Sequence, residues 1–219
     1  FSWQSVRKNF WLLVLSGVMM AFNWILLFEA YRYTTVAIAT LCYYTAPILV
    51  ILASPVLFGE KLTGWKLLCV AAAVAGMVLV SGITEPMEQG SNQWLGILLG
   101  LGAAVLYAGV VLLNKKIEGV AAYDKTLIQL GAAAVAILPY TLLMEKPDPA
   151  AFSWLTAACL LLVGILHTGI AYALYFGAVS TVKAQTAAIL SYLDPVVAIL
   201  LSALLLGEPM TLWVGIGAV

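Results

Sequence analysis

A carboxylate stands inside a stretch of chain that is otherwise almost wholly apolar. Asp194 and Pro195 interrupt the run "ILSYLDPVVAIL" at residues 189–200. A charge at the centre of a bilayer costs at least about 2.5–3.5 kcal/mol, so an acid there should face protein or a water-filled cavity. In such a cavity it could hydrogen-bond a ligand ammonium group, take up a proton, or do both in alternation. Asp194 is therefore the first candidate for chemistry.

Further candidates lie at similar depth in other apolar runs. His167, the only histidine, could share a proton with Asp194 or bind a ligand, and a packed neutral histidine explains it equally well. Asn23 and Trp24 are adjacent, and an interhelical hydrogen bond is the simpler role for Asn23. Aromatic rings and hydroxyl groups with few charges suit a neutral or zwitterionic organic molecule. The remaining candidates for substrate or proton binding are Ser191, Tyr43, Tyr107 and Tyr172.

The composition indicates an integral membrane protein. Of 219 residues, 64% are hydrophobic and 9% are charged, and the mean hydropathy is +1.07. Average soluble domains have roughly one quarter charged residues. A helix needs roughly 20 apolar residues to cross the hydrocarbon core. The apolar runs predict an all-α polytopic bundle with helices at residues 10–30, 35–58, 66–82, 94–113, 126–143, 154–177 and 184–206, and a further start at 212.

Several classes of function find no support in the residues. The net charge is zero with no basic block, so nucleic acid is not an expected partner. Cys42, Cys69 and Cys159 each lie in an apolar run and fit small packed residues, so no disulfide, metal or cofactor is predicted. An intramembrane aspartyl protease would need a second acid beside Asp194, and neither G-x-S-x-G nor H-E-x-x-H is present. We therefore do not expect an enzyme.

The basic residues define the orientation in the membrane. Eight lie in loops on one side, which the positive-inside rule makes cytoplasmic, and two, Arg32 and Lys146, lie on the other. No Lys or Arg is expected deep in a span, which argues against a phosphorylated ligand. The eight are Arg7, Lys8, Lys61, Lys66, Lys115, Lys116, Lys125 and Lys183.

An internal repeat relates the two halves of the chain. An offset of 148 residues places Pro47 on Pro195, Tyr44 on Tyr192 and "GEKLT" at 59–63 on "GEPMT" at 207–211. An odd number of predicted spans separates the two turns, so the copies are inverted. We expect residues 1–82 to be the last three helices of the first repeat, and 94–219 to be the second repeat with its last helix cut short. The complete plan would have five plus five helices.

The repeat also separates structural from functional roles. Ala46 precedes Pro47, so a proline kink by itself does not demand an acid, which favours a functional Asp194 over one that only satisfies backbone groups freed by Pro195. Glu60 and Glu208 instead follow a glycine that can close a helix and precede a threonine placed to cap the next. We interpret both as structural turns. "GILLG" at 96–100 is a packing motif of small residues.

The chain resembles the EamA family of the drug/metabolite transporter superfamily. The resemblance rests on the two copies of P-(x11)-G-E-(x2)-T at Pro47 and Pro195, on "HTGIAYALYFGAV" at 167–179 and on the inverted five-plus-five plan. It implies a secondary-active transporter, typically an exporter of small metabolites such as amino acids, that works by alternating access in the bacterial cytoplasmic (inner) membrane. Its expected partners are a small-molecule substrate and the lipid bilayer, with proton coupling and oligomeric state left open. A channel or facilitative permease is the alternative.

Overall fold

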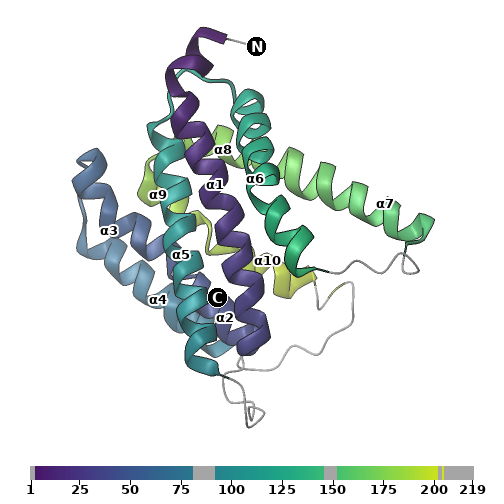
Figure 1. Ribbon diagram of the computed structural model, residues 1–219. Helices are drawn as coiled ribbons and strands as arrows, with labels where there is room; N and C mark the ends of the chain where they lie inside the picture. The colour runs from purple at the N-terminus through teal and green to yellow at the C-terminus, as the bar shows by residue number, and fades with distance from the viewer. Residues whose placement is uncertain (1–2, 81–91, 146–151, 202–203, 205–219) are drawn as a thin grey trace. The chain divides into compact units, whose positions relative to one another are not determined.

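The computed structural model describes residues 3–80, 92–145, 152–201 and 204, and the regular structure in these ranges is entirely helical (Figure 1). The all-α prediction is confirmed. The helices are α1 (Trp3–Tyr33), α2 (Val36–Tyr43), α3 (Ala46–Phe58), α4 (Gly64–Val80), α5 (Gln93–Lys116), α6 (Ala122–Met144), α7 (Trp154–Leu162), the π-helix η2 (Val163–Ile170), α8 (Ala171–Val179), α9 (Ala184–Leu190) and α10 (Leu193–Leu201). The predicted start at 212 lies outside the described residues.

Five stretches of the described chain are long and apolar enough to cross a membrane. They are Gln4–Tyr33, Ile38–Phe58, Gln93–Lys116, Ala122–Met144 and Trp154–Val179, and Gly64–Gly76 is a shorter apolar helix. This agrees with the polytopic membrane protein predicted from composition.

The chain divides into two compact units. Unit 1 comprises Phe1–Ile25 and Gly109–Val182, and unit 2 comprises Leu26–Ala108 and Lys183–Val219. The division falls inside α1 and α5, so both helices contribute residues to both units. The units are defined by which residues contact one another, so they do not test the boundaries of the sequence repeat. The boundaries at 1–82 and 94–219 stay a prediction.

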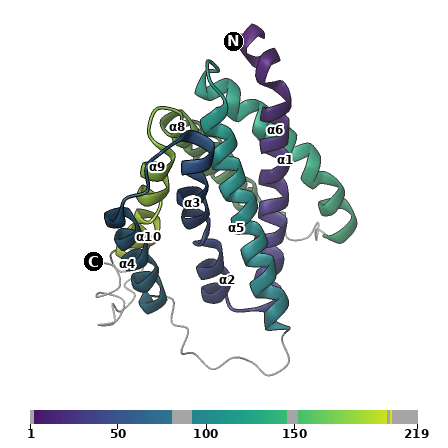
Figure 2. The same cartoon turned by 90° about the vertical axis from the view of Figure 1, so that its left-hand side faces the viewer.

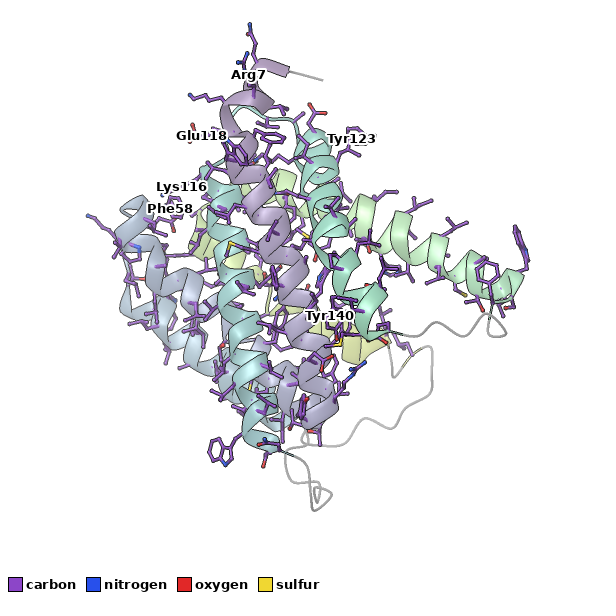
Figure 3. All side chains as sticks on the ribbon, viewed as in Figure 1. Arg7, Phe58, Lys116, Glu118, Tyr123 and Tyr140 are labelled. Carbon is purple, nitrogen blue, oxygen red and sulfur yellow. The ribbon has the colours of Figure 1, made fainter. Side chains whose placement is uncertain are left out.

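Unit 1 is built where α1 lies beside α6 (Figure 2). At Gly17, a Cβ atom would stand 2.3 Å from the Gln129 carbonyl oxygen, so the absence of a side chain permits this close approach. The buried core includes Met20, Val110 and Phe176, and α6 also packs against α8. At one end of the unit, Arg7, Lys116 and Glu118 are exposed (Figure 3), and the Asn9 side chain donates to the Glu118 carbonyl at 3.3 Å. Arg7 and Lys8 near the start of α1 and the bases that end α5 thus lie at one end of unit 1, which agrees with the predicted orientation.

Unit 2 is organised around the packing of α3 against α9. The α5 segment of this unit also approaches its neighbours closely: a Cβ at Gly96 would lie 2.7 Å from Thr34 Cγ2, and one at Gly100 would lie 3.0 Å from Cys42 Cβ. The packing role predicted for "GILLG" is confirmed.

Two predicted continuous helices are broken in the structure. The run 35–58 divides after Tyr43, and the run 184–206 divides after Leu190, each just before a proline. Proline lacks the N–H that continues a helix and is well suited to the first turn of a new one. The hydroxyls at the breaks donate backwards to the preceding helix, Thr45 to the Cys42 carbonyl at 2.7 Å and Ser191 to the Ala187 carbonyl at 3.1 Å.

Further boundaries differ from the prediction. Five bases that were assigned to loops lie inside helix ends instead, because these helices extend beyond their predicted ends: Arg7, Lys8, Lys66, Lys115 and Lys116. The helix expected at 126–143 begins at Ala122, so Lys125 is inside α6 and buried, and the prediction that it belongs to a loop was wrong. The sequence does not reveal that α6 begins at Ala122, because the N-cap residue Ala121 has no side chain that could cap a helix. The helix expected at 154–177 contains the π-helix η2 in its middle.

Candidate functional site

The two helix breaks in unit 2 lie beside each other. The Tyr192 hydroxyl donates to the Tyr44 carbonyl at 3.3 Å, and these two residues are partners in the 148-residue repeat. Other contacts join Gln185 to Ser54 and the start of α9 to Glu60. In these contacts Ala184, Gln185 and Tyr192 pair with Glu60, Ser54 and Tyr44, so the residue numbers rise on one side and fall on the other. The two broken segments therefore run antiparallel. The sequence repeat therefore has a physical counterpart at this point in the fold.

Asp194 lies in the first turn of α10, immediately after the second break. Its side chain is exposed on unit 2 and makes no hydrogen bond or ion pair with the residues that the structure describes. Its backbone N–H donates to the Ser191 carbonyl at 3.3 Å, which is the acceptor that Pro195 would have left free. Among the described residues, no hydrogen bond assigns the carboxylate to bracing the kink.

Three tyrosines extend from the break toward α5. Tyr44 is close enough to Asp194 to interact with it electrostatically. The Tyr43 ring lies 6.5 Å from that of Tyr44 and 5.5 Å from that of Tyr107, both in tilted arrangements. All three are half-buried. We call this set, Tyr44, Tyr43 and Tyr107, the tyrosine row; it brings together two of the predicted site residues within the unit that contains Asp194 and Ser191.

Unit 1 holds the other predicted aromatic residues. Trp24 and Tyr172 approach to 6.1 Å between ring centroids, and Tyr172 stacks on Phe176 at 5.2 Å. Both partly buried rings pack on the core that contains Phe176. The neighbouring Asn23 is 1% exposed and has an interaction partner. These side chains form a packed aromatic cluster, to which Asn23 adds a buried amide.

His167 lies on the π-helix η2 of unit 1, and its side chain is exposed. Such helices are rare and often mark functional positions. The Thr168 hydroxyl next to it donates to the Val163 carbonyl at 3.1 Å, five residues back. A shared proton between His167 and Asp194, which belongs to unit 2, stays a prediction.

A buried polar network that sequence reasoning missed joins three helices of unit 1. The Gln129 amide on α6 donates to Ser16 Oγ on α1 and to Asn114 Oδ1 on α5, both at 3.0 Å, and Asn114 donates to Ser16 at 3.3 Å. All three side chains are fully buried. Ser16 is a single polar residue in an apolar run, whereas Asn114 and Gln129 lie close to charged residues at the ends of their runs, and only the fold shows that the three meet.

Charged side chains near the helix ends have structural partners. Lys125 donates to the Asn114 carbonyl at 3.5 Å, and Lys115 donates to the Val182 carbonyl at 2.5 Å. Cations near a helix C-terminus are favoured by its unsatisfied carbonyls and its dipole. Gly59 closes α3 with φ of 65°, and Glu60 accepts backbone hydrogen bonds from the start of α9. The predicted turn after Gly59 is confirmed, and the contact of Glu60 with α9 was not predicted; Glu208 lies outside the described residues.

No group of three or more His, Cys, Asp or Glu side chains in the described ranges could hold a metal ion. The arrangement instead offers a carboxylate, two helix breaks joined by a hydrogen bond, and aromatic surface. These are the components of a site that binds a small organic molecule.

The comparisons with known proteins agree with this description. The sequence pattern of the EamA-like transporter family matches residues 1–82 and 94–219. The chain is similar to "Uncharacterized transporter YxxF" of Bacillus subtilis (strain 168), with 30% identity over 93% of this chain and 64% of that protein. It is also similar to an "Uncharacterized transporter" of Archaeoglobus fulgidus, with 31% identity over 84% of this chain and 63% of that protein. The chain therefore spans slightly less than two thirds of the length of these relatives.

A solved structure supports the fold. A protein crystal structure with 21% sequence identity aligns with 96% of this chain and 73% of its own, at a TM-score of 0.81. At that identity the likeness concerns the fold alone.

Proposed function

Because the chain belongs to the EamA-like transporter family, we propose that it is the core of a secondary-active transporter that exports small neutral or zwitterionic metabolites, such as amino acids, by alternating access. The observation that carries this proposal is the pair of broken helices, joined by the hydrogen bond from Tyr192 to its repeat partner Tyr44. Transporters with inverted repeats bind substrates near the midplane, at discontinuous helices contributed by both repeats.

The breaks replace regular helix by short turns whose carbonyls accept side-chain hydrogen bonds, Cys42 from Thr45 and Tyr44 from Tyr192. Non-helical backbone at membrane depth is tolerated only where it is buried in protein or lines a water-filled cavity. In unit 2, the segments between Tyr43 and Ala46 and between Leu190 and Leu193 are of this kind. A substrate that binds beside them could exchange hydrogen bonds with carbonyls and hydroxyls at little cost in desolvation.

Asp194 and the tyrosine row would recognise the charged end and the body of the substrate. An ammonium group is attracted both to a carboxylate and to the faces of aromatic rings. Asp194 makes no described ion pair, and its repeat counterpart is Ala46, so the acid is a feature of one half only. We assign Asp194 to the ammonium group or a coupling proton, and Ser191, Tyr43 and Tyr107 of the same unit to the rest of the substrate.

The remaining candidates have secondary roles in this proposal. Within unit 1, Trp24 and Tyr172 pack on the aromatic core and Asn23 holds its helix in place, while His167 would accept or donate a proton. The basic residues orient the chain with Arg7 and Lys116 in the cytoplasm. Export from the cytoplasm across the inner membrane, driven by a proton gradient, would complete the cycle.

Counterflow in proteoliposomes tests the carrier mechanism. Vesicles containing the full-length protein are loaded with one unlabelled amino acid at a time and diluted into the same labelled compound. A carrier gives transient accumulation of label that saturates with concentration, because the loaded site returns. Flux that rises linearly without counterflow, or single-channel currents, would contradict alternating access; no counterflow with any amino acid would contradict the substrate class.

A further inference from the structure

A compact set of hydrogen bonds ties the end of α3 to the beginning of α9. The Glu60 carboxylate accepts from the backbone N–H groups of Ala184 at 2.8 Å and Gln185 at 3.2 Å. The Gln185 amide donates to the Ser54 hydroxyl at 2.6 Å, and its oxygen accepts from the Lys66 ammonium group. All these residues belong to unit 2. We call the set of Ser54, Glu60, Lys66 and Gln185 the α3–α9 lock.

We propose that the α3–α9 lock is a gate, which holds the two broken helices together at their predicted cytoplasmic ends and must open when the substrate site faces the cytoplasm. The inference rests on the proposed function, since a gate presupposes alternating access. It goes beyond that function by naming the residues that hold one end of the pathway closed.

The chemistry of the lock favours a closed state that can still open. Ser54 and Gln185 are fully buried, so their hydrogen bonds are protected from competing water. A carboxylate at the N-terminus of a helix satisfies N–H groups that otherwise lack partners and interacts favourably with the helix dipole. None of the three pairings is covalent or apolar, so water can replace each one when the helices part.

The position of the lock connects it to the substrate site. Gln185 and Tyr192 both lie on the α9 side, seven residues apart, which is about 10 Å along a helix. Movement of the α9 N-terminus away from α3 would therefore be transmitted to the break that carries the Tyr192–Tyr44 hydrogen bond. Asp194 follows two residues later.

The sequence repeat shows that the lock is not symmetric. The carboxylate and the hydroxyl of the lock recur in the second repeat, because Ser54 and Glu60 correspond to Ser202 and Glu208. Gln185 and Lys66, however, correspond to Ala37 and Val214, which cannot make these hydrogen bonds through their side chains. By sequence, the complete set exists for one end only. The resting protein should therefore be closed at the end that carries Glu60.

Cysteine labelling measures the opening of the lock without any substrate. Ala188 is buried on α9, one turn beyond Gln185, so Ala188→Cys in an otherwise cysteine-free, full-length protein reports access from that side. In inside-out vesicles, a membrane-impermeant maleimide should react slowly with the parent protein. Glu60→Ala, Gln185→Ala and Ser54→Ala should each accelerate labelling, by about tenfold for the loss of a charge-assisted or buried hydrogen bond.

Matched controls keep this test specific. Thr186→Ala changes an exposed neighbour of Gln185 on α9 and should leave the labelling rate unchanged. Glu60→Gln keeps one acceptor oxygen without the charge and should give an intermediate rate. If any lock variant fails to reach the membrane folded, the other two carry the test. Labelling rates equal to the parent in every folded lock variant would overturn the proposal.

A crosslink separates failure of the lock from failure of the proposed function. Ser54→Cys/Gln185→Cys, oxidised to a disulfide, should abolish counterflow, and reduction should restore it. Counterflow that persists with a complete crosslink would refute the gate while leaving the carrier intact. If the lock variants speed labelling but the parent protein transports nothing, the proposed transport is wrong, whereas the lock still holds the helices together.

Discussion

Gly17→Ala should destabilise unit 1, because α1 and α6 touch at this glycine. The new methyl group would lie 2.3 Å from the Gln129 carbonyl oxygen and 2.8 Å from Ala132 Cβ. Ordinary contact begins at 3.4 Å, so the backbones must separate by about 1 Å. That shift would also stretch the 3.0 Å hydrogen bond between Gln129 and the adjacent Ser16. Overpacking costs about 1–3 kcal/mol and a lost hydrogen bond about 1 kcal/mol.

The matched control for this prediction is Gly131→Ala on α6. No atom lies within 4 Å of the Cβ position at Gly131. Both substitutions gain up to about 1 kcal/mol of helix propensity, so their difference isolates the close approach. In detergent, the thermal midpoint of Gly17→Ala should fall by roughly 4–16 °C relative to that of Gly131→Ala. Equal midpoints for the two variants would refute the packing of α1 on α6 described above.

Three further predictions concern polar contacts. Gln129→Leu should lower the unfolding free energy by about 1–3 kcal/mol, because the buried Asn114 Oδ1 loses its donor and Ser16 keeps only the bond from Asn114. A double-mutant cycle with Ser16→Ala should be non-additive in chemical denaturation. Tyr192→Phe removes the donor to the Tyr44 carbonyl and should cost about 1 kcal/mol in the same assay, and no loss would argue against contact between the two breaks. Lys115→Met should destabilise by about 1 kcal/mol through the lost bond to the Val182 carbonyl, whereas the exposed Lys116→Met should be neutral.

The helical architecture was predictable because it follows from hydrophobicity and spacing. Apolar runs locate the helices, and Gly59 ends α3 at a positive φ as its motif indicates. The small residues Gly96 and Gly100 lie where backbones approach, again as the pattern predicts. Each of these features depends on residues close together in the chain, so the sequence alone was enough to predict it.

The breaks and the buried polar network were less accessible. Pro47 and Pro195 indicate a kink, but whether a helix bends or divides depends on whether neighbouring hydroxyls such as Thr45 satisfy the freed carbonyls. Ser16, Asn114 and Gln129 are far apart in the chain, and their meeting is a tertiary fact. The placement of α6 likewise depends on packing, which is why Lys125 was assigned to a loop.

The candidate site was predictable in part. The sequence identified Asp194, Ser191, Tyr43 and Tyr107 because each is a polar or aromatic residue predicted to lie deep in the membrane. All four belong to unit 2, where Tyr43 and Tyr107 are members of the tyrosine row. The hydrogen bond between the repeat partners Tyr44 and Tyr192 was not foreseen, because an offset between two sequences shows equivalence and says nothing of contact.

The most direct test of the central proposal is gradient-driven accumulation of a labelled amino acid by the full-length protein in proteoliposomes, compared with Asp194→Asn. The substitution keeps the size of the side chain and removes its charge. We expect a proton gradient to drive accumulation in the parent, and the variant to lose that drive or to bind the substrate at least about tenfold more weakly. Equal accumulation and equal affinity in the two proteins would contradict the proposal, and the carboxylate beside the broken helix would then have no part in recognition or coupling.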